Sequence, residues 1–163
     1  MNYKTLKNIY PYDTAIGRIY VADNGSAIAG VFLPGNAVPA GIPQNETDVI
    51  KRAAVQITEY LSGRRREFDV KVEPEGTDFQ KRVWAALRTI PYGHTCSYSH
   101  IAHIAGNPKA CRAVGMANNR NPVSIIIPCH RVIGKSGALV GYGGGLELKK
   151  CLLDMEAANT IQG

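Results

Sequence analysis

The 163-residue sequence lacks the features that mark membrane, secreted and zinc-binding proteins. No apolar run approaches the roughly 18 to 20 residues that a membrane-spanning helix needs. The start, Met1-Asn2-Tyr3-Lys4, is not followed by the apolar stretch of a secretory signal peptide. The four cysteines form no CxxC pair and no zinc-ribbon spacing. We therefore expect an intracellular, cytoplasmic protein with no metal site and no membrane contact.

Acidic residues are scarce only in the second half of the chain. The formal net charge is +6. Residues 1–74 hold nine basic and eight acidic residues, whereas residues 75–163 hold ten basic and five acidic residues and all four histidines. This asymmetry suggests that the second half meets a polyanion such as nucleic acid. A basic domain that binds no polyanion is the alternative at this point.

The first half, residues 1–74, carries no chemical motif and is predicted to be a structural α/β domain. Asp23-Asn24-Gly25 is strong hairpin-turn chemistry between two β-rich runs. Apolar residues at helical spacing are followed by Gly63, a typical helix C-cap. The predicted elements are strands at 16–22, 27–33 and 68–72 and a helix from Thr47 to Leu61.

The second half, residues 75–163, is predicted to be mainly helical. Thr77 and Gln80 have the spacing of a capping box, which predicts a helix ending near Thr89. Two short helical patterns follow, at 97–105 and 108–118. The Gly-Asn-Pro turn between them predicts a helix-turn-helix, with Asn107 as the cap of the second helix and Pro108 as its first residue.

The second of these helices is slim and basic. Alanine and glycine alternate there with Lys109, Arg112 and Arg120. Small side chains let a helix backbone approach another surface closely, either a neighbouring helix or a nucleic-acid groove. A minor groove is only about 6 Å wide, whereas a helix with its side chains is about 10 to 12 Å across. Only a slim helix against a widened groove could approach the bases there.

The segment from Asn121 to Val132 is the most informative for chemistry. An apolar, β-branched run meets Pro128, and Cys129 and His130 follow directly. The thiolate is the nucleophilic form of cysteine, and nearby histidine and arginine charge favours it. A buried, unreactive cysteine is the alternative that composition alone leaves open.

Four ordered motifs carry a family resemblance: Arg112-Ala113-Val114-Gly115, Asn121-Pro122, Pro128-Cys129-His130-Arg131-Val132 and Gly141-Tyr142-Gly143-Gly144-Gly145-Leu146. Together they resemble the O6-alkylguanine-DNA alkyltransferases, and the match runs from about Gly76 to Glu156. The first half resembles the family's N-terminal domain only in length and in its hairpin and helix pattern. The resemblance implies an α+β fold. It consists of an N-terminal ribonuclease H-like sheet-and-helix domain and a C-terminal helical, winged-helix-like domain with the helix-turn-helix.

The resemblance also implies catalytic roles for individual residues. It makes Cys129 the acceptor nucleophile, His130 its base acting through water, and Glu156 the residue that orients His130. Asn121 matches the hinge asparagine between the recognition helix and the active-site strand. Adjacent side chains on an extended strand point to opposite faces, so Cys129 and His130 can cooperate only if the chain turns there. Pro128 makes such a turn plausible.

Substrate contacts are implied in the same way. Tyr98 matches a tyrosine that pushes on the target phosphate, and Arg112 matches the arginine that fills the place of the extruded base. Main-chain groups read the guanine, here the carbonyls of Cys129 and Val132 and the amide near Gly143. The expected substrate-binding and DNA-binding residues are Tyr98, Arg112, Arg131, Val132, Tyr142, Gly143 and Lys149.

The implied function is DNA repair by irreversible, stoichiometric transfer of an alkyl group, mainly methyl, from O6-alkylguanine to Cys129. The base is flipped out through the minor groove, and neither metal nor cofactor takes part. The expected partner is double-stranded DNA that contains alkylated guanine. The protein is expected to be a monomer, with cooperative assembly on DNA and repair of O4-alkylthymine left open.

Two other functions fit parts of the sequence. A hydrolase with a Cys-His-Glu triad would use Cys129 repeatedly through a thioester, but it gives no role to the helix-turn-helix or to the basic second half. A non-catalytic binder of alkylated DNA would resemble the alkyltransferase-like proteins. Those carry another residue where Cys129 stands, so the thiol argues against this interpretation.

Overall fold

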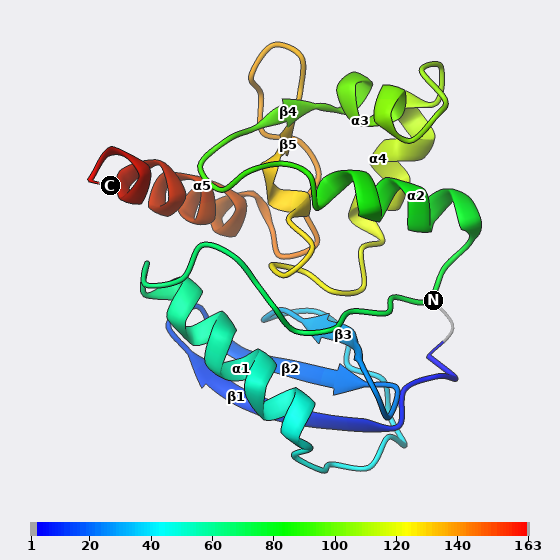
Figure 1. Cartoon of the computed structure of the whole chain (residues 1–163), viewed down its shortest axis with the longest axis vertical. Helices are drawn as coiled ribbons and strands as arrows, with labels where there is room; N and C mark the ends of the chain where they lie inside the picture. Colours follow the sequence, from blue (N-terminus) through cyan, green and yellow to red (C-terminus); the bar gives the residue numbers. More distant parts are fainter. Residues whose placement is uncertain (1–2, 163) are drawn as a thin grey trace. The chain divides into compact units, whose positions relative to one another are not determined.

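The structure is a computed structural model and describes residues 3–162. The chain forms two compact units. The first consists of the residues up to Glu75 together with Pro122–Ile126, and the second consists of Gly76–Asn121 and the residues from Ile127 onward. Nothing in the sequence predicts that Pro122–Ile126 belongs to the first unit. Figure 1 shows the helices and strands of each unit.

The first unit contains an antiparallel sheet in the order β1 (Asn8–Thr14), β2 (Gly17–Asp23), β3 (Ile28–Phe32). The predicted hairpin between β2 and β3 is present. Strand β1 was not predicted, because Pro11 weakens the strand pattern. A proline is tolerated at the edge of a sheet, and β1 is the edge strand beside β2, with one further isolated bridge from Ile9 to Gln44.

Helix α1 (Asp48–Leu61) lies across one face of this sheet (Figure 1). Its buried side chains recur at the predicted helical spacing: Ile50, Ala53, Ala54, Ile57 and Tyr60. Thr47 caps the start by accepting from the amide of Ile50. Gly63 follows the end with a φ of 76°, a left-handed conformation that favours glycine.

The strand predicted at residues 68–72 is wrong. Val72 forms only an isolated bridge with Ile28 at the start of β3. The backbone amide of Asp69 donates to the side chain of Gln56 on α1 at 3.1 Å, so the segment is held partly by a side chain instead of a strand ladder. A period-2 pattern in five residues is too short to reveal this competition.

The second unit begins with helix α2 (Asp78–Leu87), where the predicted capping box of Thr77 and Gln80 is confirmed. The helix ends two residues before the predicted Thr89. Trp84 is buried and its indole Nε1 donates to the carbonyl of Ala117 at 2.8 Å. Two short parallel strands, β4 (Cys96–Ser97) and β5 (Val132–Ile133), and the long helix α5 (Leu146–Ile161) complete the frame.

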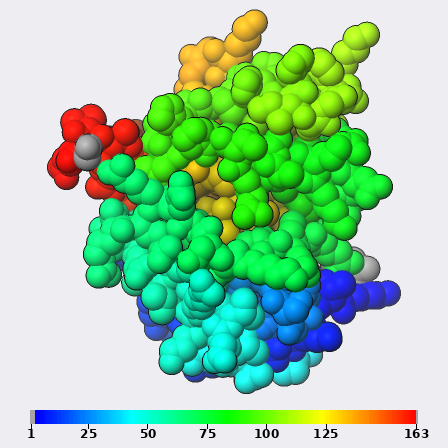
Figure 2. All heavy atoms as spheres, in the orientation of Figure 1, coloured from blue at the N-terminus to red at the C-terminus, as the bar shows by residue number. Residues whose placement is uncertain are grey.

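Helices α3 (Tyr98–Ile104) and α4 (Cys111–Asn119) form the predicted helix-turn-helix. The predicted start of the second helix is wrong, because Pro108 lies in a turn closed by a hydrogen bond from Ala110 N to Asn107 O at 3.0 Å. The fixed φ of proline suits the second position of such a turn as well as it suits the first turn of a helix. In the space-filling view, the loop before α4 and the loop after β5 project from the surface of this unit (Figure 2).

Within residues 3–162, no helix is both long enough and apolar enough to cross a membrane.

Candidate active site

The segment before the nucleophile is irregular and does not form the strand that the sequence suggested. Ile125 has a φ of 73°, which is strained for a β-branched residue. The amide Nδ2 of Asn121 donates to the carbonyl of Ile127 at 2.8 Å. Asn121 therefore links the end of α4 to the backbone just before Pro128, which fits the hinge position expected for it. The segment that follows Asn121 is bent and is not a strand.

Cys129 and His130 lie on a single turn of 3-10 helix, η1 (Cys129–Arg131), directly after Pro128. This is the turn that joint action of the two side chains requires. Both residues are buried, with 3% and 0% of their surfaces exposed. A thiol held in this way is shielded from bulk solvent and sits on a short, closed backbone turn.

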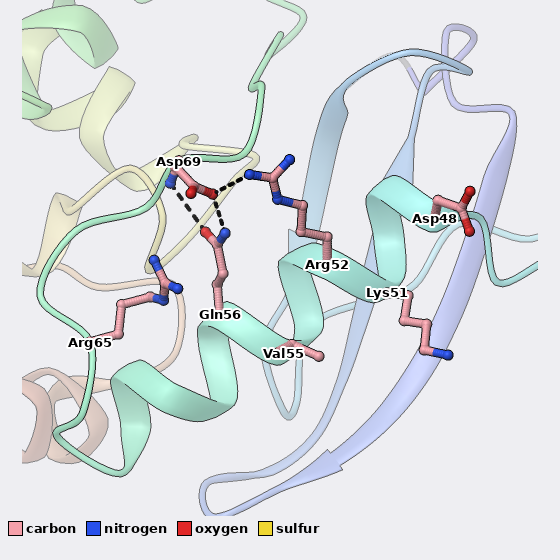
Figure 3. Close-up of a pocket in the computed structure, with 7 residues that line it drawn as sticks. All are labelled: Asp48, Lys51, Arg52, Val55, Gln56, Arg65 and Asp69. Atoms are coloured by element: carbon pink, nitrogen blue, oxygen red, sulfur yellow. Dashed lines mark hydrogen bonds and ion pairs between the residues drawn. The ribbon is translucent and has the colours of Figure 1, made fainter.

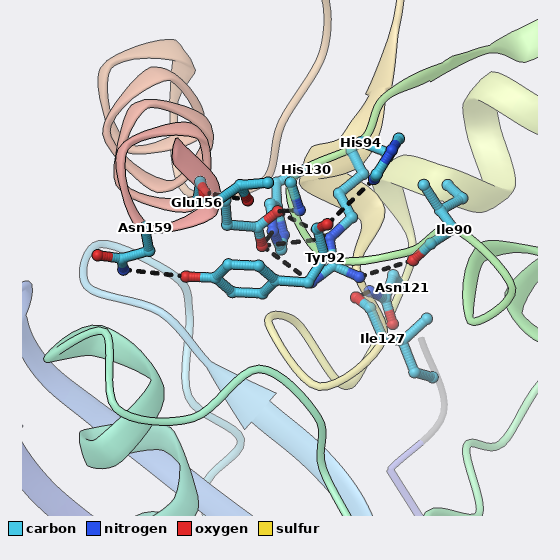
Figure 4. Close-up of polar contacts among 11 residues, drawn as sticks. Ile90, Tyr92, His94, Asn121, Ile127, His130, Glu156 and Asn159 are labelled. Carbon is cyan, nitrogen blue, oxygen red and sulfur yellow. Dashed lines mark hydrogen bonds and ion pairs between the residues drawn. The ribbon is translucent and has the colours of Figure 1, made fainter. Parts of the chain in front are cut away.

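The carboxylate of Glu156, from α5, is the centre of a buried polar cluster (Figure 4). Its Oε1 lies 2.8 Å from Nε2 of His130. Arg131 donates from Nε to both carboxylate oxygens at 3.1 and 3.0 Å and from Nη2 to Oε1 at 2.9 Å. The amide of Gly93 donates to Oε2 at 3.0 Å. Glu156 therefore holds both η1 side chains that follow Cys129.

These contacts set the protonation states of the cluster. Burial by itself would raise the pKa of Glu156, but hydrogen bonds and charge from His130 and Arg131 outweigh burial and hold this pKa at about 2. Burial lowers the pKa of His130 below its ordinary value, although Glu156 opposes the shift. His130 is therefore neutral near pH 7. Since a carboxylate only accepts, the proton lies on Nε2 and the ring presents Nδ1 as its acceptor.

Three side chains surround Cys129 closely enough to respond to its charge. Burial and the Cys129 thiolate both raise the pKa of Tyr98, and the same causes raise that of Tyr142 well above its ordinary value. Burial lowers the pKa of Lys149, and the Cys129 charge opposes this shift. All three side chains therefore lie within electrostatic range of the thiol.

Lys149 acts inside the second unit and is fully buried. Its Nζ donates to the carbonyls of Val132 at 2.6 Å and Val140 at 2.9 Å. The hydroxyl of Tyr98 donates to the same Val140 carbonyl at 2.9 Å. These bonds join α3, β5, α5 and the loop before α5 into one wall. Lys149, which was expected near the substrate, therefore stabilises that wall through buried hydrogen bonds.

The glycine-rich loop beside this wall is tightly packed at Gly141 and open at Gly143. Gly141 has a φ of 53°, and a Cβ there would lie 2.9 Å from Oδ1 of Asn119. At Gly143 the nearest atom to an added Cβ is 4.0 Å away. Tyr142 between them lies edge-on to His130, with ring centroids 6.5 Å apart. Its hydroxyl is buried and has no hydrogen-bond partner within residues 3–162.

Two expected substrate-binding groups already have hydrogen-bond partners within the protein. The guanidinium of Arg131 is buried and bonded to Glu156 and to the carbonyl of Ile90, so it does not reach outward to a ligand. The carbonyl of Cys129 already accepts from the amide of Val132 and from Nδ2 of Asn118 at 3.3 Å. A carbonyl oxygen has two lone pairs, and both are engaged here.

Helix α4 carries Arg112, the residue expected to fill the place of the extruded base. Arg112 is exposed in its first turn. Gly115, one turn later, leaves space for the ring of Tyr98, which would lie 3.9 Å from an added Cβ. The slim face that the sequence predicted thus serves partly to accommodate Tyr98.

Asn118 was given no role from the sequence. It is 2% exposed, on the buried face of α4 with Val114 and Ala117. Its spacing of four residues from Val114 could have indicated this, because residues i and i+4 share a helix face.

A separate surface hollow of about 450 Å³ lies in the first unit (Figure 3). It is lined by Asp48, Lys51, Arg52, Val55, Gln56, Arg65 and Asp69. Arg52 pairs there with Asp69 at 3.0 Å, and Arg65 pairs with Glu59 at 2.7 Å. The hollow holds no cysteine or histidine.

Two family models match the chain. The 6-O-methylguanine DNA methyltransferase ribonuclease-like domain matches residues 9–74, and the DNA binding domain of the same name matches residues 78–158. A methylated-DNA--protein-cysteine methyltransferase of Methanosarcina acetivorans is 48% identical over 151 residues, which are 90% of this chain and 96% of the relative. The inducible enzyme of that name from Bacillus subtilis is 47% identical, over 91% of this chain and 84% of its own.

Solved structures agree with these relatives. Mycobacterium tuberculosis OGT in complex with DNA superposes with a TM-score of 0.88 at 43% identity, covering 93% of this chain and 94% of its own. An O6-methylguanine DNA methyltransferase from Methanococcus jannaschii has a TM-score of 0.68 at 28% identity, covering 90% and 92%. The α+β fold with an N-terminal sheet-and-helix domain and a C-terminal helical DNA-binding domain is thereby confirmed. On these grounds, the chain belongs to the 6-O-methylguanine DNA methyltransferase family.

Proposed function

We propose that this protein repairs DNA by transferring the alkyl group of O6-alkylguanine directly to Cys129. The observation that carries the proposal is the buried turn that places Cys129 beside His130, with His130 bonded to Glu156 at 2.8 Å. Relatives named for this transfer share nearly half of their residues with the chain. The proposed partner is double-stranded DNA that contains alkylated guanine, and the protein is proposed to act on it inside the cell.

The reaction follows from the protonation states of the cluster. The thiol proton of Cys129 passes through water to Nδ1 of His130, and Glu156 stabilises the resulting imidazolium. The thiolate attacks the alkyl carbon and forms a C–S bond while the bond from that carbon to O6 breaks. The electron pair stays with guanine, which takes up the proton from the His130 imidazolium through water, so that the histidine returns to its neutral form. The thioether product is a poor leaving group, so each molecule acts once and needs no cofactor.

The rest of the second unit would bring the base to the thiol. A base inside a duplex must be extruded before its O6 substituent can be reached, at a cost of a few kcal/mol. We assign Arg112 on α4 to the vacated position in the stack and Tyr98 to the adjacent phosphate. The carbonyl of Val132 and the amide near Gly143 would contact the guanine, with Tyr142 flanking it.

Arg131 and Lys149 take revised roles. Both are buried cations bonded within the second unit. We propose that Arg131 positions Glu156 and that Lys149 positions the loop before α5. The first domain, residues 1–74, is proposed to be structural, and residues 75–163 to bind DNA as a monomer.

Intact-mass measurement tests the proposal. Incubation with an oligonucleotide duplex carrying O6-methylguanine should add one methyl group to the peptide that contains Cys129, and Cys129→Ser should gain none. The absence of any mass gain in the wild-type protein would refute the transfer. Repeated turnover on an ester would favour the Cys-His-Glu hydrolase instead, and full repair by Cys129→Ala would refute the assigned nucleophile.

A further inference from the structure

The loop between α2 and β4 contacts both members of the buried pair formed by Arg131 and Glu156. The amide of Gly93 donates to Oε2 of Glu156 at 3.0 Å, and the carbonyl of Ile90 accepts from Nη1 of Arg131 at 2.8 Å. Tyr92 lies between these two loop residues in the chain, and its side chain extends from the same cluster (Figure 4). The loop therefore fixes the pair from its backbone and places one aromatic side chain beside it.

Tyr92 uses both its ring and its hydroxyl. The guanidinium carbon of Arg131 lies over the ring, 5.6 Å from the ring centroid. A cation over an aromatic face is attracted by it, and more strongly where water is excluded. The hydroxyl accepts from Nδ2 of Asn159 at 3.1 Å. Because Asn159 lies on α5, one turn after Glu156, this bond fixes the ring to the helix that carries the carboxylate.

The ring also shields the pair from water. Arg131 is 6% exposed and Glu156 is fully buried, whereas Tyr92 is partly exposed. Since the ring covers the guanidinium and itself reaches solvent, removing it would admit water to the pair. Water competes for the hydrogen bonds between Arg131 and Glu156 and weakens the attraction between their charges.

His130 connects this pair to the nucleophile, because Oε1 of Glu156 meets both Arg131 and Nε2 of His130. Burial lowers the pKa of His130, and Glu156 opposes this shift. The charges of Arg131 and Lys149 lower the pKa further. Tyr142, which faces the imidazole edge-on, stays neutral because burial raises its pKa well above the ordinary value. Water beside Arg131 would relieve the burial and screen the arginine charge, so the pKa of His130 would rise.

We propose that Tyr92 is a positioning residue for alkyl transfer, whose ring covers the Arg131 guanidinium and keeps water from the pair that orients His130. The inference rests on the proposed function and deepens it. Tyr92 touches neither the thiol nor the base. It acts through Arg131 and Glu156, and it keeps His130 neutral and ready to accept the thiol proton of Cys129.

The acid limb of transfer tests this role, because only neutral His130 can accept the thiol proton. Single-turnover rate constants on a duplex carrying O6-methylguanine are measured between about pH 5 and about pH 8. Tyr92→Ala should move the acid limb upward by about half a pH unit, as expected for the loss of one cation–π contact. Below the limb, its rate relative to its own plateau should be about three-fold lower than that of the wild type. Tyr92→Phe keeps the ring and should retain the wild-type limb.

NMR titration of His130 gives a second measurement that does not require transfer. Its Cε1 proton, assigned by its loss in His130→Gln, should report protonation at a higher pH in Tyr92→Ala than in the wild type. The absence of transfer in the wild type at every pH would refute the proposed function, and the titration would still test the effect of Tyr92 on His130.

Controls separate positioning from a general loss of stability. Tyr20→Ala removes a partly buried tyrosine that packs against the core of the first unit, and it should lower Tm without moving the limb. Tyr92→Leu repeats the removal of the ring if Tyr92→Ala does not fold. A wild-type limb and an unchanged His130 titration in both of these Tyr92 variants would overturn the inference. An equal shift of the limb in Tyr92→Phe or in Tyr20→Ala would also overturn it.

Discussion

Replacing Glu156 with glutamine should destabilise the protein strongly at neutral pH and much less in acid. Glu156 is fully buried and pairs with Arg131, and its pKa is about 2 instead of 4.5. This difference corresponds to about 3 kcal/mol of stability that ionisation of Glu156 contributes. Removing one partner of a buried ion pair costs about 3 to 5 kcal/mol, because the remaining charge stays buried. We expect Glu156→Gln to lose an amount in this range at pH 7.5.

The pH dependence of this loss has a definite sign. The pKa of Glu156 is lower in the folded than in the unfolded chain, so its contribution is complete above about pH 4.5 and is lost as the pH falls towards 2. The pKa of His130 is also lowered by burial, so the wild type should already begin to lose stability below its ordinary value of 6.5. The difference between wild type and Glu156→Gln should therefore shrink steadily below about pH 4.5.

Urea unfolding at a series of pH values measures both effects. Asp13→Asn is the matched control, because it removes a carboxylate from an exposed pair with Arg18 and should leave the midpoint nearly unchanged. Adding Arg131→Met to Glu156→Gln should recover part of the loss, since the uncompensated charge is then gone. A midpoint for Glu156→Gln that matches the control, or a difference from wild type that does not diminish in acid, would refute this reasoning.

Four further substitutions test other parts of the structure. Arg112→Ala should slow transfer from a duplex at least ten-fold, because base extrusion costs a few kcal/mol and Arg112 is proposed to offset part of that cost. Transfer from the free base O6-methylguanine should stay unchanged. Equal slowing on both substrates would argue against a role in the DNA stack. Gly141→Ala should lower the unfolding free energy by about 1 kcal/mol or more, because the φ of 53° and the nearby Asn119 both oppose a Cβ. Gly143→Ala, with open space at its Cβ, should stay within about 0.5 kcal/mol in the same urea titration. Trp84→Phe removes the donor to the Ala117 carbonyl and should cost about 1 to 3 kcal/mol, measured by thermal unfolding; an unchanged Tm would show that this bond contributes nothing.

Elements with strong local signals were predictable from the sequence. The capping box before α2, the helical spacing of α1 and the hairpin between β2 and β3 all depend on residues close together in the chain. The failures occurred where local signals were ambiguous. Pro108 suits both a turn and a helix start, and residues 68–72 alternate like a strand although Gln56 takes the amide of Asp69.

Residue types and their spacing were enough to predict the family, the likeness of the second half to a DNA-binding domain, and the order of its motifs around Cys129. These are properties of residue types at short spacings, which folding does not alter. Which groups face one another could be read only from the folded chain. Arg131 follows Cys129 by two residues, yet its charge is directed to Glu156, 25 residues away. Asn118, which no motif marked, lies against the Cys129 carbonyl. Hydrogen bonds and burial depend on contacts between distant segments, so only the folded chain establishes them.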